Sequence, residues 1–135
     1  MNDRLVAKIS EEEVRDAVFE MGGSKAPGPD GFPGSFFQSF WDIVGTEVVV
    51  AVQDFQISKF MPRDVNSTFI AFIPKVKEAV SFSNFRPISL CNFLYKIVAK
   101  VLANRLKTIL PLIINPNQEG FVLGHQILDG ISLAH

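Results

Sequence analysis

The sequence has little cysteine, no long apolar run and no acidic residues placed to share a metal ion. Its single cysteine, Cys91, excludes an intramolecular disulfide and a zinc site built from cysteines. The longest apolar runs, at residues 48–52, 69–74 and 109–114, fall well short of the ~18 residues that a membrane-spanning helix needs. The first ten residues lack the apolar centre of a secretory signal. We therefore expect an intracellular protein without a membrane partner.

The acidic residues do not form a recognisable catalytic pair. Nucleotidyl transfer by two metal ions needs carboxylates that bind both ions, which lie about 4 Å apart. Glu11–Glu13 suit the start of a helix, Asp30 suits a turn, and Asp129 stands alone. His125 and His135 do not have a metal-binding spacing. From the residues alone we identify no catalytic residue and no metal ligand.

Charge is distributed unevenly along a chain whose net charge is −1. Residues 1–54 carry ten acidic and four basic side chains, whereas residues 55–135 carry four acidic and nine basic ones. A basic half points to a polyanionic partner. A solvated basic surface is the commoner explanation, because dedicated nucleic-acid domains are usually more basic.

The expected fold is α+β, mostly helical with a short antiparallel β ribbon, in one small domain. Ser10 and Glu13 fit a capping box, which predicts a helix over residues 11–21. The segment 24–34, rich in proline and glycine, predicts a rigid loop that begins near Lys25. A wide apolar face predicts one mostly buried helix over residues 35–55, with its Phe and Trp side chains in the core.

Two extended segments follow this helix. Residues 68–73 are β-branched and aromatic and predict a buried strand. Residues 84–88 are also extended, because Pro87 disfavours helical backbone at Arg86. If the segments pair as an antiparallel ribbon, Lys75 and Arg86 meet at its exposed end. An ammonium group beside a guanidinium fork suits a triphosphate, which makes this pair the candidate anion site.

The strongest helical pattern covers residues 93–113. Its apolar residues form one stripe, made of Leu94, Ile97, Val98, Val101, Leu102, Leu106, Ile109 and Ile113. Three lysines lie on the opposite face, most simply as a solvated surface: Lys96, Lys100 and Lys107. Arg105 falls within the stripe, so we expect it to pair with Glu119 or Asp129.

Several blocks of the sequence resemble, in order, those of reverse transcriptases of LINE-type (non-LTR) retrotransposons. The blocks are KAPGPDGF at residues 25–32, IPK at 73–75, NFRPISLCN at 84–92, ANRL at 103–106, QEGF at 118–121 and ILD at 127–129. They cover nearly the whole chain, and the Leu-Cys-Asn form is similar to that of plant elements. One such block is a weak signal, whereas this many in the family's order are specific.

The resemblance implies an RNA-directed DNA polymerase that uses magnesium ions, with an RNA template, a DNA primer and dNTPs as partners and a nuclear location. In this family the lysine of the IPK block and the arginine of the RPIS block contact the triphosphate of the incoming nucleotide. The resemblance therefore implies Lys75 and Arg86 as nucleotide-binding residues. The KAPGPDG loop and the Q-x-x-F segment lie along the template, which implies template contacts by Lys25, Gln118 and Phe121.

The family's metal-binding aspartates belong to two later blocks that this sequence does not contain. We therefore expect residues 1–135 to be a single partial domain: fingers and entry to the palm, without the catalytic palm blocks or the thumb, and inactive alone. His125 stands where the family usually has arginine, which weakens the expected phosphate contact there. The alternative is a non-catalytic retrotransposon remnant that at most binds nucleic acid. A third reading, an interaction domain unrelated to nucleic acid, requires the block matches to be coincidental.

Overall fold

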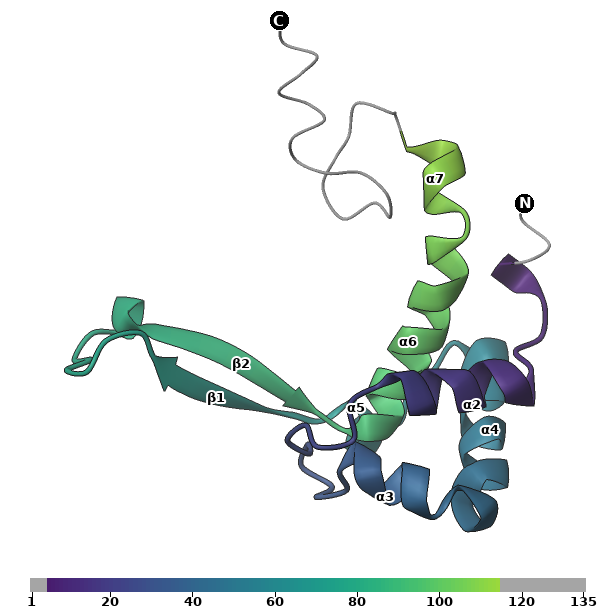
Figure 1. Ribbon diagram of the computed structural model, residues 1–135, viewed down its shortest axis with the longest axis horizontal. Coiled ribbons are helices and arrows are strands. Elements are labelled where there is room, and N and C mark those ends of the chain that lie inside the picture. The colour runs from purple at the N-terminus through teal and green to yellow at the C-terminus, as the bar shows by residue number, and fades with distance from the viewer. Residues whose placement is uncertain (1–4, 115–135) are drawn as a thin grey trace, which may run out of the picture. The chain divides into compact units, whose positions relative to one another are not determined.

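The computed structural model describes residues 5–114, and the chain divides into two compact units. The larger unit comprises residues 8–99, and the other comprises residues 1–7 with the residues from Lys100 onward. The elements are α2 (Glu11–Glu20), α3 (Gly34–Ser39), α4 (Trp41–Ser58), α5 (Arg63–Asn66), β1 (Thr68–Pro74), the 3-10 turn η1 (Phe82–Asn84), β2 (Phe85–Cys91), α6 (Phe93–Lys107) and α7 (Leu110–Ile113) (Figure 1). Helices with one two-stranded antiparallel sheet confirm the predicted α+β class.

Helix α2 begins at the predicted capping box. The Ser10 hydroxyl accepts from the Glu13 N–H at 3.2 Å, and the Glu13 carboxylate accepts from the Ser10 N–H at 2.9 Å. Two backbone donors that a helix start leaves without partners are satisfied in this way. The apolar positions of α2 then point inward, since Val14, Ala17 and Val18 are fully buried.

Replacing Ser10 by alanine is expected to lower the free energy of unfolding by about 1 kcal/mol, because the Glu13 N–H loses its acceptor. Urea denaturation followed by circular dichroism measures this difference. Ser39→Ala is the matched control, because Ser39 is exposed and no side-chain hydrogen bond of it occurs within residues 5–114. Equal stability of the two variants would contradict the role of the cap.

The segment before α2 is held by side chains of α4. The Ile9 N–H donates to Gln56 Oε1 at 2.8 Å, and Gln53 Nε2 donates to the Ile9 carbonyl at 2.7 Å. Ile9 itself is buried. At the other end of α2, Gln38 Nε2 donates to the carbonyls of Val18 and Met21 at 2.9 and 2.8 Å. Glutamine amides therefore supply the backbone partners at both ends of this helix.

The single buried helix expected over residues 35–55 is wrong on two counts. The chain forms α3 and α4, separated at Phe40, where the backbone leaves helical geometry with φ −110° and ψ 22°. The aromatic stripe is also divided, because Phe37 is buried but Phe40 is 48% exposed. Neither glycine nor proline lies at the break, and the apolar periodicity of the sequence continues through it. The sequence pattern therefore does not indicate where α3 ends.

The helix expected over residues 93–113 is also two helices. Pro111 lacks an N–H, and its ring would collide with the carbonyl four residues earlier, at Lys107, which is where α6 ends. Within the smaller unit, Arg105 donates to the carbonyls of Leu5 and Ala7 at 3.1 and 2.6 Å. The carboxylates expected to pair with Arg105, at positions 119 and 129, lie outside the described residues.

The core of the larger unit is aliphatic, with two stacked phenylalanines. Its buried side chains come mainly from α2, α4 and α6: Ile9, Val14, Ala17, Val18, Phe37, Val48, Val49, Val52, Phe93, Ile97 and Val98. In α6 the predicted apolar stripe is only partly buried, because Leu102 and Leu106 are 41% and 46% exposed. None of the helices described has the length and apolar character to cross a membrane.

Candidate nucleotide and nucleic-acid interface

The two strands form the predicted antiparallel ribbon. Their register pairs Thr68 with Cys91 at one end and Pro74 with Phe85 at the other (Figure 1). The predicted burial of β1 is wrong, because all of its residues except Ala71 are exposed. An apolar strand normally indicates cover on both faces. Within the described part of the chain, however, no further strand pairs with this ribbon.

Lys75 and Arg86 lie on the same face of the ribbon. Arg86 is opposite Ile73, and the Lys75 N–H continues the ladder by donating to the Asn84 carbonyl at 2.7 Å. Because side chains alternate along a strand, positions 73 and 75 share one face with position 86. The two cations are thus diagonal neighbours near the tip of the ribbon, as the sequence predicted. Both side chains are exposed.

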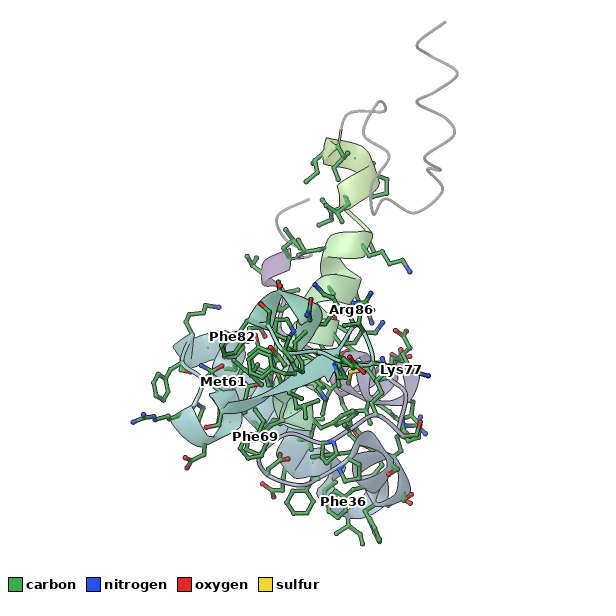
Figure 2. The ribbon with its side chains drawn as sticks, turned by 90° about the vertical axis from the view of Figure 1, so that its left-hand side faces the viewer. Phe36, Met61, Phe69, Lys77, Phe82 and Arg86 are labelled. Atoms are coloured by element: carbon green, nitrogen blue, oxygen red, sulfur yellow. The ribbon has the colours of Figure 1, made fainter. Side chains whose placement is uncertain are left out.

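The surroundings leave both cations able to bind an anion. Lys75 Nζ donates to the Ser83 carbonyl at 2.8 Å, and an ammonium group has two further donors. Within residues 5–114, no hydrogen bond or ion pair of the Arg86 side chain occurs, so its fork of donors faces solvent. Figure 2 looks toward the tip of the ribbon, with Arg86 and Lys77 on the right of the view and Phe82 on the left.

Aromatic side chains gather on the opposite face of the tip. Phe72 lies edge-on to Phe82 and Phe85, with ring centroids 6.1 and 6.4 Å apart. Phe72 and Phe85 alternate with Ile73 and Arg86, so their side chains point away from the cations. Phe82 is 85% exposed, and its 3-10 turn η1 lies at the tip of the ribbon, directly before β2 (Figure 1).

The loop that carries Lys25 is ordered by a turn and by a lysine of α6. The Gly31 N–H donates to the Gly28 carbonyl at 3.0 Å, and the Phe32 N–H donates to the Asp30 carboxylate at 3.1 Å. Lys96 Nζ donates to the Ala26 carbonyl at 3.3 Å. Lys96, which we assigned to a solvated surface, therefore also holds this loop. Lys25 itself is exposed.

Sequence reasoning missed Asn92 as a residue that organises this region. Asn92 is 2% exposed, and it is the one buried polar side chain among the described residues. Its hydrogen bonds reach the loop at Asp30 and the helix α5 at Asp64 and Val65. The available signal was an asparagine between two apolar residues immediately before a helix, with a glycine-rich loop elsewhere in the chain.

An apolar hollow of about 430 Å³ lies elsewhere in the larger unit. It is lined by the C-terminal half of α4, residues 60–62, Val65 of α5 and Leu94 and Val98 of α6. Asp54 is the one ionisable side chain in this lining. Without convergent polar groups, the hollow offers no specific chemistry to a ligand.

The described residues do not supply a metal site. Within residues 5–114, no group of three or more His, Cys, Asp or Glu side chains could hold a metal ion. We therefore assign no residue to the magnesium ions that the resemblance implies. The expected template residues Gln118 and Phe121, and His125, lie outside the described residues.

Comparison with known proteins relates the chain to a transposon protein. No family model matches the chain. It is 34% identical over 131 residues to a protein of Xenopus laevis described as the Transposon TX1 uncharacterized 149 kDa protein. The match covers 97% of this chain and 10% of that protein, so the chain spans about a tenth of the length of this relative. Nearly the whole chain is thus similar to a segment of a transposon-encoded protein.

Proposed function

We propose that this chain belongs to the fingers of an RNA-directed DNA polymerase encoded by a non-LTR retrotransposon. In this proposal Lys75 and Arg86 bind the triphosphate of the incoming nucleotide. The loop at Lys25 contacts the RNA template of a template–primer duplex, and Gln118 and Phe121 are proposed to do so too. The catalytic aspartates, which would bind the two magnesium ions, belong to blocks that this sequence does not contain. A nuclear location follows from the same proposal.

The observation that carries the proposal is the shared face of Lys75 and Arg86 on an exposed ribbon. The register places a point charge and a planar donor fork side by side, which is the combination that suits adjoining phosphates. The similarity to a transposon-encoded protein supports an origin in a retrotransposon. The block resemblance supplies the finer assignment to a reverse transcriptase.

Neutralising either cation is expected to weaken nucleotide binding. Lys75→Gln or Arg86→Gln removes charge-assisted hydrogen bonds worth about 1.5–3 kcal/mol each, which corresponds to a loss of about tenfold or more in affinity. Filter binding of radiolabelled dTTP to the purified chain, with tripolyphosphate as competitor, measures the loss. Arg86→Lys keeps the charge but loses the fork, so it should bind with intermediate affinity.

Arg15→Gln is the matched control, because Arg15 lies on α2, where it packs over the Phe19 ring at 5.5 Å. It removes the same charge as Arg86→Gln and should leave dTTP affinity unchanged. If the control and the ribbon variants lose affinity equally, binding reflects net charge alone and the proposed nucleotide site is wrong.

A non-catalytic remnant that binds nucleic acid without a nucleotide site remains the second candidate. The observation that supports it is the exposure of the ribbon cations Lys75, Lys77 and Arg86, since phosphate contacts need accessible positive charge. Such a protein would bind a labelled RNA–DNA duplex through Lys75, Lys77, Arg86 and Lys96. Its affinity would fall steeply with salt, by a slope close to the number of phosphates contacted. It would bind dTTP no better than inorganic tripolyphosphate.

A further inference from the structure

Asn92 occupies the position directly before α6, but its side chain does not cap that helix. Asparagine at this position usually accepts from a backbone N–H of the first helical turn. Here the Asn92 carbonyl oxygen accepts instead from the Asp30 N–H at 3.1 Å, across 62 residues of sequence. The amide nitrogen donates to the carbonyls of Asp64 at 2.7 Å and Val65 at 3.3 Å. Every bond of this buried side chain therefore joins separate segments.

The loop approaches Asn92 so closely that a side chain on the loop would not fit. A Cβ atom on Gly28 would lie 2.4 Å from both the backbone N and Oδ1 of Asn92, and 2.5 Å from the carbonyl carbon of Cys91. The contact is thus made by backbone against backbone, with the turn at Gly28–Gly31 seated on the end of β2. Hydrogen bonding and close packing fix the loop at the same point.

The segments that meet at Asn92 are those that carry the proposed ligand contacts. Asp30 belongs to the loop that begins near Lys25, and Val65 lies in α5, directly before β1. Asn92 itself follows β2, so it lies at the base of the ribbon, where Thr68 of β1 pairs with Cys91 of β2. A single amide therefore links the loop to both strands at the base of the ribbon.

We infer that Asn92 is a positioning residue that fixes the loop and the ribbon in one mutual arrangement, and so sets how template and nucleotide are presented to each other. The nature of the ligands rests on the proposed function, whereas the mechanical link does not. Only an amide can fill this role, because the site needs an acceptor for the Asp30 N–H and donors for two carbonyls. Aspartate supplies the acceptor alone, and alanine supplies neither.

Asn92→Asp should break one half of the link and leave the other. At pH 7 the introduced carboxylate still accepts from the Asp30 N–H but faces the carbonyls of Asp64 and Val65 without a donor. In the ¹⁵N-labelled chain, amide exchange at position 66, in α5, should accelerate by about three- to tenfold, while the Asp30 amide stays protected. Amides of α2 and α4 should exchange at unchanged rates once corrected for global stability.

Acidification should reverse this effect. Burial raises the pKa of a carboxyl group, so the introduced group should protonate as the pH falls toward about 5. Its pKa is then higher in the folded than in the unfolded chain, and the folded state gains stability as the pH falls through that value. The protonated group has a hydroxyl donor for the Asp64 carbonyl, and protection at position 66 should return. A residue that merely fills space would not show this reversal.

Two further variants complete the test. Asn66→Asp introduces the same charge at an exposed neighbouring position, where water solvates the carboxylate, so lowering the pH toward about 5 should not change protection at position 66. Gly28→Ala should break the other half of the link, accelerating exchange of the Asp30 and Gly31 amides while position 66 stays protected. If Asn92→Asp does not fold at pH 7, Gly28→Ala still tests whether the loop can be loosened separately from α5.

The outcomes separate this inference from the proposed function. One outcome is that neither the natural chain nor any variant binds dTTP, while exchange at the Asp30 amide and at position 66 accelerates separately as described. The positioning role of Asn92 is then supported, and the proposed nucleotide site is wrong. If dTTP binding depends on Arg86 while Asn92→Asp alters neither amide exchange nor dTTP affinity, the inference is overturned. It is also overturned if acidification does not restore protection at position 66.

Discussion

Phe93→Ala is expected to lower the free energy of unfolding by about 3–5 kcal/mol. Phe93 is 4% exposed, and its ring stacks on that of Phe37, with centroids 5.0 Å apart and planes inclined by 26°. The edge of the ring lies against Gly34, where a Cβ atom would approach Cε2 of Phe93 to 2.6 Å. Truncation therefore removes a buried aromatic pair and leaves a cavity between α3 and α6. Urea denaturation followed by circular dichroism measures the loss.

Phe60→Ala is the matched control for this substitution, because Phe60 is 67% exposed. It should change stability by about 0.5 kcal/mol or less. Gly34→Ala supplies a second check, since the added methyl group collides with the Phe93 ring in the natural chain but not after Phe93→Ala. The double variant should therefore be more stable than the sum of the single effects predicts. Additive effects would show that the ring does not occupy this space.

Gly28→Ala is expected to destabilise the fold by about 3 kcal/mol, at the upper end of the range for overpacking. The atoms that the methyl group would meet are the backbone and Oδ1 of Asn92 and the backbone of Cys91, at 2.4–2.5 Å. Neither backbone can move without displacing the start of α6 or the end of β2. Thermal or urea unfolding measures the loss, and amide exchange locates it in the loop.

Gly31→Ala is the informative comparison, because Gly31 needs glycine for a different reason. Its φ is +76°, and a Cβ atom there would meet nothing within 4 Å. The strain is conformational and amounts to about 1–2 kcal/mol. Gly31→Asn should be milder than Gly31→Ala, because asparagine tolerates left-handed backbone. At position 28 the larger asparagine should be worse than alanine. The same order of effects at both positions would contradict this distinction.

Local patterns predicted local structure well. The capping box gave the start of α2 at Glu11, and Pro87 gave extended backbone in β2. The pairing that brings Lys75 beside Arg86 followed from two short extended segments with a turn between them. Each of these features depends on residues a few positions apart or on a neighbouring strand.

Features set by distant residues could not be predicted from the sequence. The break at Phe40 has no glycine or proline to announce it. The exposure of β1 depends on which other segments pack on the ribbon. The apolar composition of β1 indicates that it should be buried but not by what. Asn92 gains its importance from Asp30, 62 residues away, and nothing in its own neighbourhood distinguishes that contact from an ordinary helix cap. The break before Pro111, in contrast, is predictable from the sequence, because proline has no N–H to donate to the Lys107 carbonyl.

The bonds between Ile9 and the glutamines of α4 impose an order on folding. They close loops of 47 and 44 residues, and the backbone of Ile9 has its partners on a helix formed much later in the chain. Closing such loops carries an entropic penalty that short-range helix formation does not. We therefore expect α4 to form before the N-terminal segment docks. During synthesis from the N-terminus, the Ile9 segment before α2 can dock on α4 only after Gln56 has been synthesised.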